Sequence, residues 1–171
     1  MSKALKVMLI LVMVTVSSTG CFSVSGISVK KVVSSTEINQ RSYNLGGIGA
    51  FAEVVGAGVK ELALSAPLPP EKMDALVEEA ERIAADNNVQ LYREDDFLVT
   101  DLFPAELTEG THVLLIYKDR TLEKYKALKA EKRRLEQAGE YQGRAREDIA
   151  RKFGQLLSYS KEKIDELLKG N

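Results

Sequence analysis

Four charged residues that follow predicted strands are the best candidates for a chemical site in this chain of 171 residues. Asp101 follows the predicted strand 97–100, and Lys118, Asp119 and Arg120 follow the predicted strand 111–117. Ligands of α/β sheets bind beyond the carboxyl ends of the strands, where such side chains can converge. Lys118 and Arg120 would stabilise an anion there, and Asp101 would orient a polar group. The pattern is compatible with a small-ligand-binding protein or a hydrolase.

The other reactive residue types do not form a recognisable catalytic set. The single His112 precedes an apolar run, which favours a neutral, hydrogen-bonded structural imidazole over a catalytic base. One His and one Cys cannot build a Cys/His zinc cluster or an intrachain disulfide. No Gly-x-Ser-x-Gly nucleophile motif occurs. We therefore expect no metal and no cofactor, and binding is favoured over catalysis.

Two local patterns suggest ligands but lack the context that those ligands need. Acidic residues gather at 94–96 and at Asp101, yet the spacing of a calcium-binding loop is missing, so we expect a polar turn. Residues 47–52 (GIGAFA) match the loose form of a dinucleotide-binding glycine loop. No buried strand precedes them, and Gly56 and Gly58 would interrupt the helix that must follow. We expect a glycine-rich loop, or a short apolar segment packed closely on a neighbour.

The first 21 residues have the three-part organisation of an export signal. Lys3 and Lys6 precede a ten-residue run, Val7 to Val16, that is apolar except for Thr15, and small residues then lead to Cys21, the only cysteine. A helix of ten residues rises about 15 Å, roughly half of a bilayer core, so this run is too short to span a membrane. The segment therefore predicts export.

This segment resembles the signal peptide of a bacterial lipoprotein. Gly20 and Cys21 match the end of the lipobox, whereas Ser18 stands where leucine is usual. The resemblance implies cleavage before Cys21, diacylglycerol on its sulfur and a further acyl chain such as palmitate on its new amino group. Because Phe22 is not the aspartate that retains lipoproteins at the inner membrane, it favours the outer membrane, facing the periplasm, in a host with two membranes.

Charge is segregated along the chain although the net charge is −1. Residues 53–109 carry 14 acids and 4 bases, and residues 119–152 carry 11 bases and 7 acids. Arg144, Arg146 and Arg151 either brace the acidic half through ion pairs or form a surface that binds an envelope protein or an anionic lipid. The near-neutral total argues against nucleic acid as a partner.

Apolar periodicity predicts the elements that position these residues. We expect strands at 62–65, 89–92, 97–100 and 111–117, with 89–92 and 97–100 joined by a polar turn. A helix begins at Pro70 and carries one apolar stripe up to residue 84. Three further helices follow, one from Thr121, one after Gly143 and one capped by Ser160.

These elements predict an α+β or α/β fold, in which a small mixed sheet with one β-α-β crossover is followed by three C-terminal helices. We expect an export signal at 1–20, the lipidated Cys and a tether at 21–42, and one globular domain at 43–171. The predicted function is that of a membrane-tethered envelope lipoprotein that acts as a binding or assembly accessory factor through its charge-segregated helical domain. The alternative is a periplasmic small-ligand-binding protein or hydrolase that uses the strand-end residues.

Overall fold

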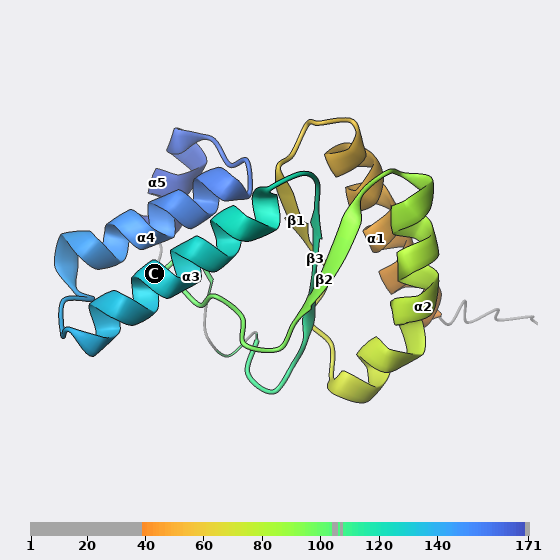
Figure 1. Cartoon of the computed structure of the whole chain (residues 1–171), viewed down its shortest axis with the longest axis horizontal. Helices are drawn as coiled ribbons and strands as arrows, with labels where there is room; N and C mark the ends of the chain where they lie inside the picture. The colour runs from red at the N-terminus through yellow and green to blue at the C-terminus, as the bar shows by residue number, and fades with distance from the viewer. Residues whose placement is uncertain (1–38, 104–105, 107, 170–171) are drawn as a thin grey trace, which may run out of the picture. The chain divides into compact units, whose positions relative to one another are not determined.

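A three-stranded sheet lies between two layers of helices in the computed structural model (Figure 1). The structure describes residues 39–103, 106 and 108–169. The predicted export signal, Cys21 and nearly all of the predicted tether lie outside these residues. One layer holds α1 (Gln40–Gly56) and α2 (Pro70–Asp86), and the other holds α3 (Thr121–Gln137), α4 (Gly143–Leu156) and α5 (Lys161–Lys169). The α+β class and the three C-terminal helices are confirmed.

The last strand of the chain occupies the centre of the sheet. The strands are β1 (Leu62–Leu64), β2 (Gln90–Glu94) and β3 (Val113–Tyr117), in the order β1-β3-β2. All five residues of β3 are buried, as its dense apolar run predicts. The predicted crossover runs from β1 through α2 to β2, and β3 inserts between these two strands. The prediction of a mixed sheet needs one correction, because both pairings are antiparallel.

The glycine-rich segment forms a helix and not the predicted loop. Leu45, Ile48, Ala52 and Val55 recur at helical spacing and are buried against α2 and the sheet, so this packing offsets the low helix propensity of glycine. The Asn39 side chain caps the helix by accepting a hydrogen bond from the backbone of the third residue that follows. Gln40–Ser42, assigned to the tether in the sequence analysis, therefore form the first residues of α1.

Close packing on a neighbour, the second expectation for this segment, is found at its end. A Cβ at Gly56 would lie 2.5 Å from the backbone oxygen of Asn87, which follows α2. Only glycine fits this contact without a shift of backbone, because real Cβ atoms do not approach an oxygen so closely. Gly56 therefore lets the C-terminal ends of α1 and α2 meet.

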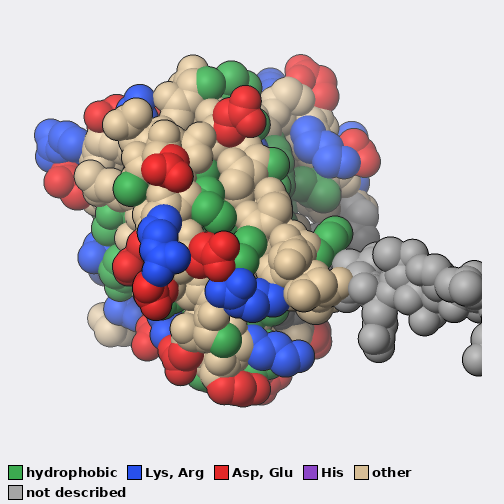
Figure 2. Space-filling view, turned by 90° about the vertical axis from the view of Figure 1, so that its right-hand side faces the viewer, with side chains coloured by type: hydrophobic (Ala, Val, Ile, Leu, Met, Phe, Trp, Pro, Cys, Tyr) green, Lys and Arg blue, Asp and Glu red, His purple; other side chains and the backbone are tan. Residues whose placement is uncertain are grey.

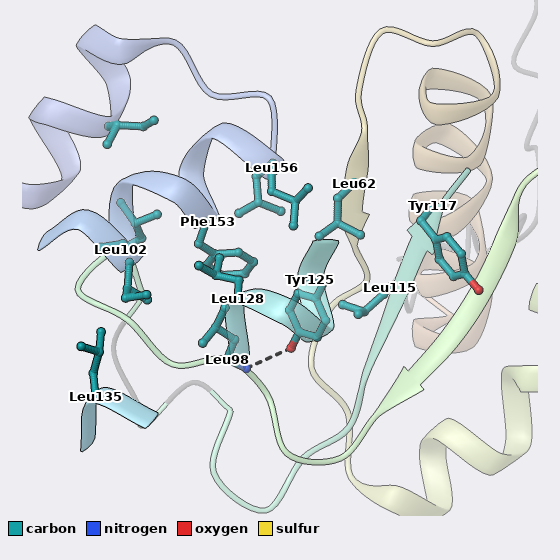
Figure 3. Packing of buried hydrophobic residues seen from close by; sticks show 14 residues of the cluster. Leu62, Leu98, Leu102, Leu115, Tyr117, Tyr125, Leu128, Leu135, Phe153 and Leu156 are labelled. Carbon is teal, nitrogen blue, oxygen red and sulfur yellow. Dashed lines mark hydrogen bonds between the residues drawn. The ribbon is translucent and has the colours of Figure 1, made fainter. Parts of the chain in front are cut away.

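The predicted strand at 97–100 is wrong, because this segment leaves the sheet after Glu94. The backbone N–H of Leu98 donates to the Tyr125 hydroxyl at 3.0 Å and not to a neighbouring strand. Leu98 and Leu102 then fill the space under α3 and α4 (Figure 3). Burial of these two side chains removes apolar surface from water, and this favours packing under the helices over a further strand beside β2.

The core on this side of the sheet centres on Phe153 of α4. Its ring centroid lies 5.7 Å from that of Phe97, 5.9 Å from that of Phe103 and 6.1 Å from that of Tyr125 (Figure 3 labels Phe153 and Tyr125). Burial raises the pKa of the Tyr125 hydroxyl far above its ordinary value. The helices expected from Thr121 and after Gly143 therefore each bury one apolar face in this core.

Candidate functional site

The structure does not bring the four predicted strand-end residues together. Lys118 Nζ donates to the backbone oxygen of Gly56 at 3.1 Å, and Arg120 pairs with Glu123 at 2.7 Å. Asp119 adopts a φ of 53° in the turn from β3 to α3, a conformation that Asp tolerates better than most residues. These three residues line a hollow of about 440 Å³ at the start of α3, and Asp101 does not line it.

Strand polarity explains why Asp101 lies elsewhere. The prediction placed the ends of two strands at one edge of the sheet, which requires those strands to be parallel. In the structure, Tyr117 at the end of β3 pairs with Gln90 at the start of β2. The chain that leaves β2 therefore emerges at the opposite end of the strands from Lys118. There the Asp101 carboxylate is bound by Arg146, whose Nε lies 2.8 Å from both oxygens.

The three arginines proposed as an anion surface each face an acidic side chain. Arg146 binds Asp101, Arg151 binds Glu147 and Asp165, and Arg144 lies 3.9 Å from Asp148. The hydrogen bond from Arg151 lowers the pKa of the Asp165 carboxyl and raises that of the guanidinium. Only Arg146 pairs with the acidic half of the chain, as the first of the two predicted roles requires, because the acids that Arg144 and Arg151 face belong to α4 and α5.

The acidic cluster after β2 is part of the same bracing. Glu94 is only 3% exposed, and its Oε1 lies 3.0 Å from Lys129 Nζ and 2.9 Å from the Asp96 backbone nitrogen. Lys129 and Arg133 bind Asp96 as well, and the hydrogen bond from Lys129 is the main cause that lowers the pKa of the Asp96 carboxyl. No group of three potential metal ligands occurs among the described His, Cys, Asp and Glu residues.

His112 is held in a structural hydrogen bond. Its Nδ1 accepts from Arg93 Nε at 2.6 Å, and Arg93 also binds Asp74 and the backbone oxygen of Pro70. The backbone of His112 pairs with that of Leu68. The contacts join β2, β3 and the start of α2, as expected for the structural imidazole.

The face formed by α1 and α2 carries intermixed charges. Figure 2 shows Lys and Arg side chains next to Asp and Glu side chains over this surface. Arg41 of α1 binds Glu79 of α2 at 2.8 Å, and Arg82 binds Glu78 within α2. Such exposed pairs contribute about 0–1 kcal/mol each. This face therefore offers mixed charge rather than a field of one sign.

Sequence reasoning missed an apolar cleft beside β1. The cleft has a volume of about 290 Å³, and its lining combines α1, β1 with the residues after it, the β2–β3 connection, β3 and the α4–α5 turn. The lining residues are Phe51, Lys60, Ala63, Leu64, Ser65, Pro67, Phe97, Phe103, Thr108, Val113, Leu157 and Tyr159. They come from separate parts of the chain, so no local sequence pattern marks them.

Small side chains and one exposed aromatic ring shape this cleft. Ala63 and Ser65 contribute small side chains to the lining. The ring of Phe51 stands at the rim and is 40% exposed. The Ser65 hydroxyl donates to the backbone oxygen of Ala66 and accepts from the backbone N–H of Leu114, both at 2.9 Å. Its hydrogen-bonding capacity is therefore used within the fold.

Lys60 is the charged residue among those that line the cleft. Its Nζ donates to the backbone oxygen of Leu157 and lies 5.2 Å above the ring of Tyr159. Within the described part of the chain, no carboxylate forms an ion pair with Lys60. Burial lowers the pKa of this ammonium group, because desolvation disfavours its charged form. The cleft thus places one cation without a counter-ion beside an apolar surface.

No protein-family model matches the chain, and the searches of curated proteins and of solved structures found no match. Among the residues that the structure describes, none of the helices combines the length and the apolar character needed to cross a membrane. A proposal for the function of this protein therefore rests on its own residues, and above all on the cleft.

Proposed function

We propose that this protein is an exported lipoprotein of the cell envelope that acts by binding, and that the cleft beside β1 is its binding site. The observation that carries this proposal is an open apolar cavity of about 290 Å³ with a partly exposed aromatic ring at its rim. Ligand sites in proteins are concave and mostly apolar, with a few polar groups that fix orientation. The cleft has this composition.

The basic helices are a weaker candidate for the binding surface. Arg146 and Arg151 already have carboxylate partners within the chain. An external anion would have to displace these partners, and the displaced carboxylates would then lack their own counter-charges. The cleft needs no such exchange, because a ligand there would displace only water from an apolar wall.

Anchoring through Cys21 is the second part of the proposal and follows from the export signal. Diacylglycerol and an amide-linked acyl chain would hold the mature protein at a membrane, since two or more chains are needed for stable attachment. In a host with two membranes, Phe22 favours the outer membrane, with the folded domain facing the periplasm. The cleft would then meet ligands of the envelope.

Position-specific photocrosslinking in producing cells tests the binding role. A benzophenone side chain is introduced in place of Phe51, which lines the cleft, or in place of Tyr43. Tyr43 is the matched control, since it is also an exposed aromatic residue of α1 but does not line the cleft. We expect an adduct at position 51 that is absent at position 43. The same adducts at both positions would contradict the proposed site.

A further inference from the structure

Charge and apolar surface are separated within the cleft. The rings of Phe51, Phe97 and Phe103 and the side chain of Leu64 contribute apolar surface, whereas Lys60 contributes a positive charge beside Tyr159. A ligand that matches both features has an apolar body and one anionic end. A purely apolar ligand would leave the ammonium group without a counter-ion.

The contacts of the Lys60 ammonium group indicate which polar group a ligand would have to supply. An ammonium group has three N–H donors, and one of them is used by the backbone oxygen of Leu157. The neighbouring Glu61 carboxylate is bound by Lys124 and does not serve Lys60. A partly buried cation that forms no ion pair with a described residue favours a carboxylate oxygen as its partner, because charge-assisted hydrogen bonds are the strongest type.

An extended peptide added as a strand to β1 fits less well. The α4–α5 turn covers the start of this edge, where the backbone N–H of Glu61 donates to the Ser158 hydroxyl at 3.0 Å and Leu62 is fully buried. Pro67 follows β1, and proline has no N–H to donate to an added strand. Only a short stretch of edge stays open, so main-chain pairing would contribute little.

The size of the cavity favours one short chain over a lipid with two chains. Its volume of about 290 Å³ lies at the lower end of small-ligand sites, which begin at roughly 300 Å³. We propose that the cleft binds a free medium-chain fatty acid, with the chain on the apolar wall and the carboxylate on Lys60 Nζ. This inference deepens the proposed binding function and rests on it.

Competition with two ligands of equal chain length tests this assignment. The full-length protein is reconstituted in nanodiscs of zwitterionic phospholipid at neutral pH and labelled with a decanoate analogue that carries a photoreactive diazirine. We expect saturable labelling of peptides that line the cleft. Decanoate should compete about tenfold better than decanol, which has the same chain but no charge, since about 1.4 kcal/mol for a charge-assisted hydrogen bond corresponds to tenfold.

Variants at two lysines show whether this preference comes from Lys60. Lys60→Gln should remove the preference for decanoate over decanol, and Lys60→Arg should keep it because the charge remains. Lys72→Gln is the control, since Lys72 lies on α2 and does not line the cleft. Leu64→Trp should fill the cavity and weaken competition by both ligands alike.

The outcomes separate this inference from the proposed function. Equal competition by decanol and decanoate in the unmodified protein overturns the inference without any variant, and so does an unchanged preference in a folded Lys60→Gln protein. If the benzophenone at position 51 captures only proteins in cells, the binding function stands and the fatty-acid assignment falls. If no adduct is specific to position 51, the binding function itself falls.

Discussion

Removal of the Lys129 ammonium group should destabilise this protein more than removal of any exposed cation. Glu94 is 3% exposed, and its carboxylate accepts hydrogen bonds from Lys129 Nζ at 3.0 Å and the Asp96 backbone N–H at 2.9 Å and also interacts with the Tyr125 hydroxyl. In Lys129→Met the Asp96 backbone N–H and the Tyr125 hydroxyl remain, but both are neutral, so the buried carboxylate loses its positive partner. Loss of one partner of a buried pair costs about 3–5 kcal/mol, because the other charge is left without compensation.

This loss is large compared with the total free energy of unfolding, which is typically about 5–15 kcal/mol. Urea denaturation of a chain from residue 37 onward, where the compact unit begins, measures it. Lys152→Met is the control: Lys152 pairs with Glu131, and the two side chains are 50% and 37% exposed. We expect the control to lose about 0–1 kcal/mol.

A double-mutant cycle then assigns the effect to the pair. Glu94→Gln removes the charge that needs Lys129, so Lys129→Met should cost less in that background than in the unmodified protein. Coupling between groups in contact is about 0.5–3 kcal/mol. If Lys129→Met costs no more than Lys152→Met, or if the two changes at the pair are additive, the buried carboxylate is compensated by other groups and the reasoning is refuted.

Four further predictions concern the packing, the titration and the anchor. Phe153→Ala should lower the free energy of unfolding by about 3–5 kcal/mol, and an unchanged urea midpoint would contradict the burial of its ring. Gly56→Ala should destabilise by about 1–3 kcal/mol, whereas Gly47→Ala, whose Cβ would meet nothing within 4 Å, should stabilise by about 0.5–1 kcal/mol. Since its hydrogen bonds lower the pKa of Asp96 in the folded state, their stabilisation is present at neutral pH and is lost as the pH falls below about 4. Asp96→Asn should therefore reduce the acid sensitivity of the melting temperature, and an unchanged sensitivity would count against it. Cys21→Ala should abolish incorporation of radiolabelled palmitate, and persistent labelling would exclude this residue as the lipidation site.

The fold could be predicted where a local pattern and the tertiary structure agree. The apolar run of β3 and the single stripe of α2 are such cases, because each pattern has one period and one buried face. At α1 the local pattern and the tertiary structure disagree. Five glycines between residues 46 and 58 lower the local helix propensity, and packing against α2 restores the helix. The segment 97–100 has the pattern of a strand, but its hydrogen-bond partner is the distant Tyr125.

The candidate site was harder to predict because it depends on strand direction and on long-range packing. Asp101 and Lys118 both follow predicted strands, but antiparallel pairing of β2 and β3 separates them. The cleft joins Phe51, Leu64 and Tyr159, which lie far apart in the sequence, and none of them belongs to a motif. Lys60 precedes a predicted strand like many surface lysines, and only the structure shows that its ammonium group forms no ion pair with any carboxylate that is described.

The strand order also determines when this chain can fold. Among the residues described, both outer strands pair only with β3, so this three-stranded sheet cannot form until residues up to 117 have been made. Before that point no sheet exists for α1 and α2 to cover, and their apolar faces can pack against each other but not against the strands. Such long-range pairing slows folding. For a chain exported as proposed, late formation of the sheet keeps the nascent protein unfolded, which is the state that a narrow export channel accepts.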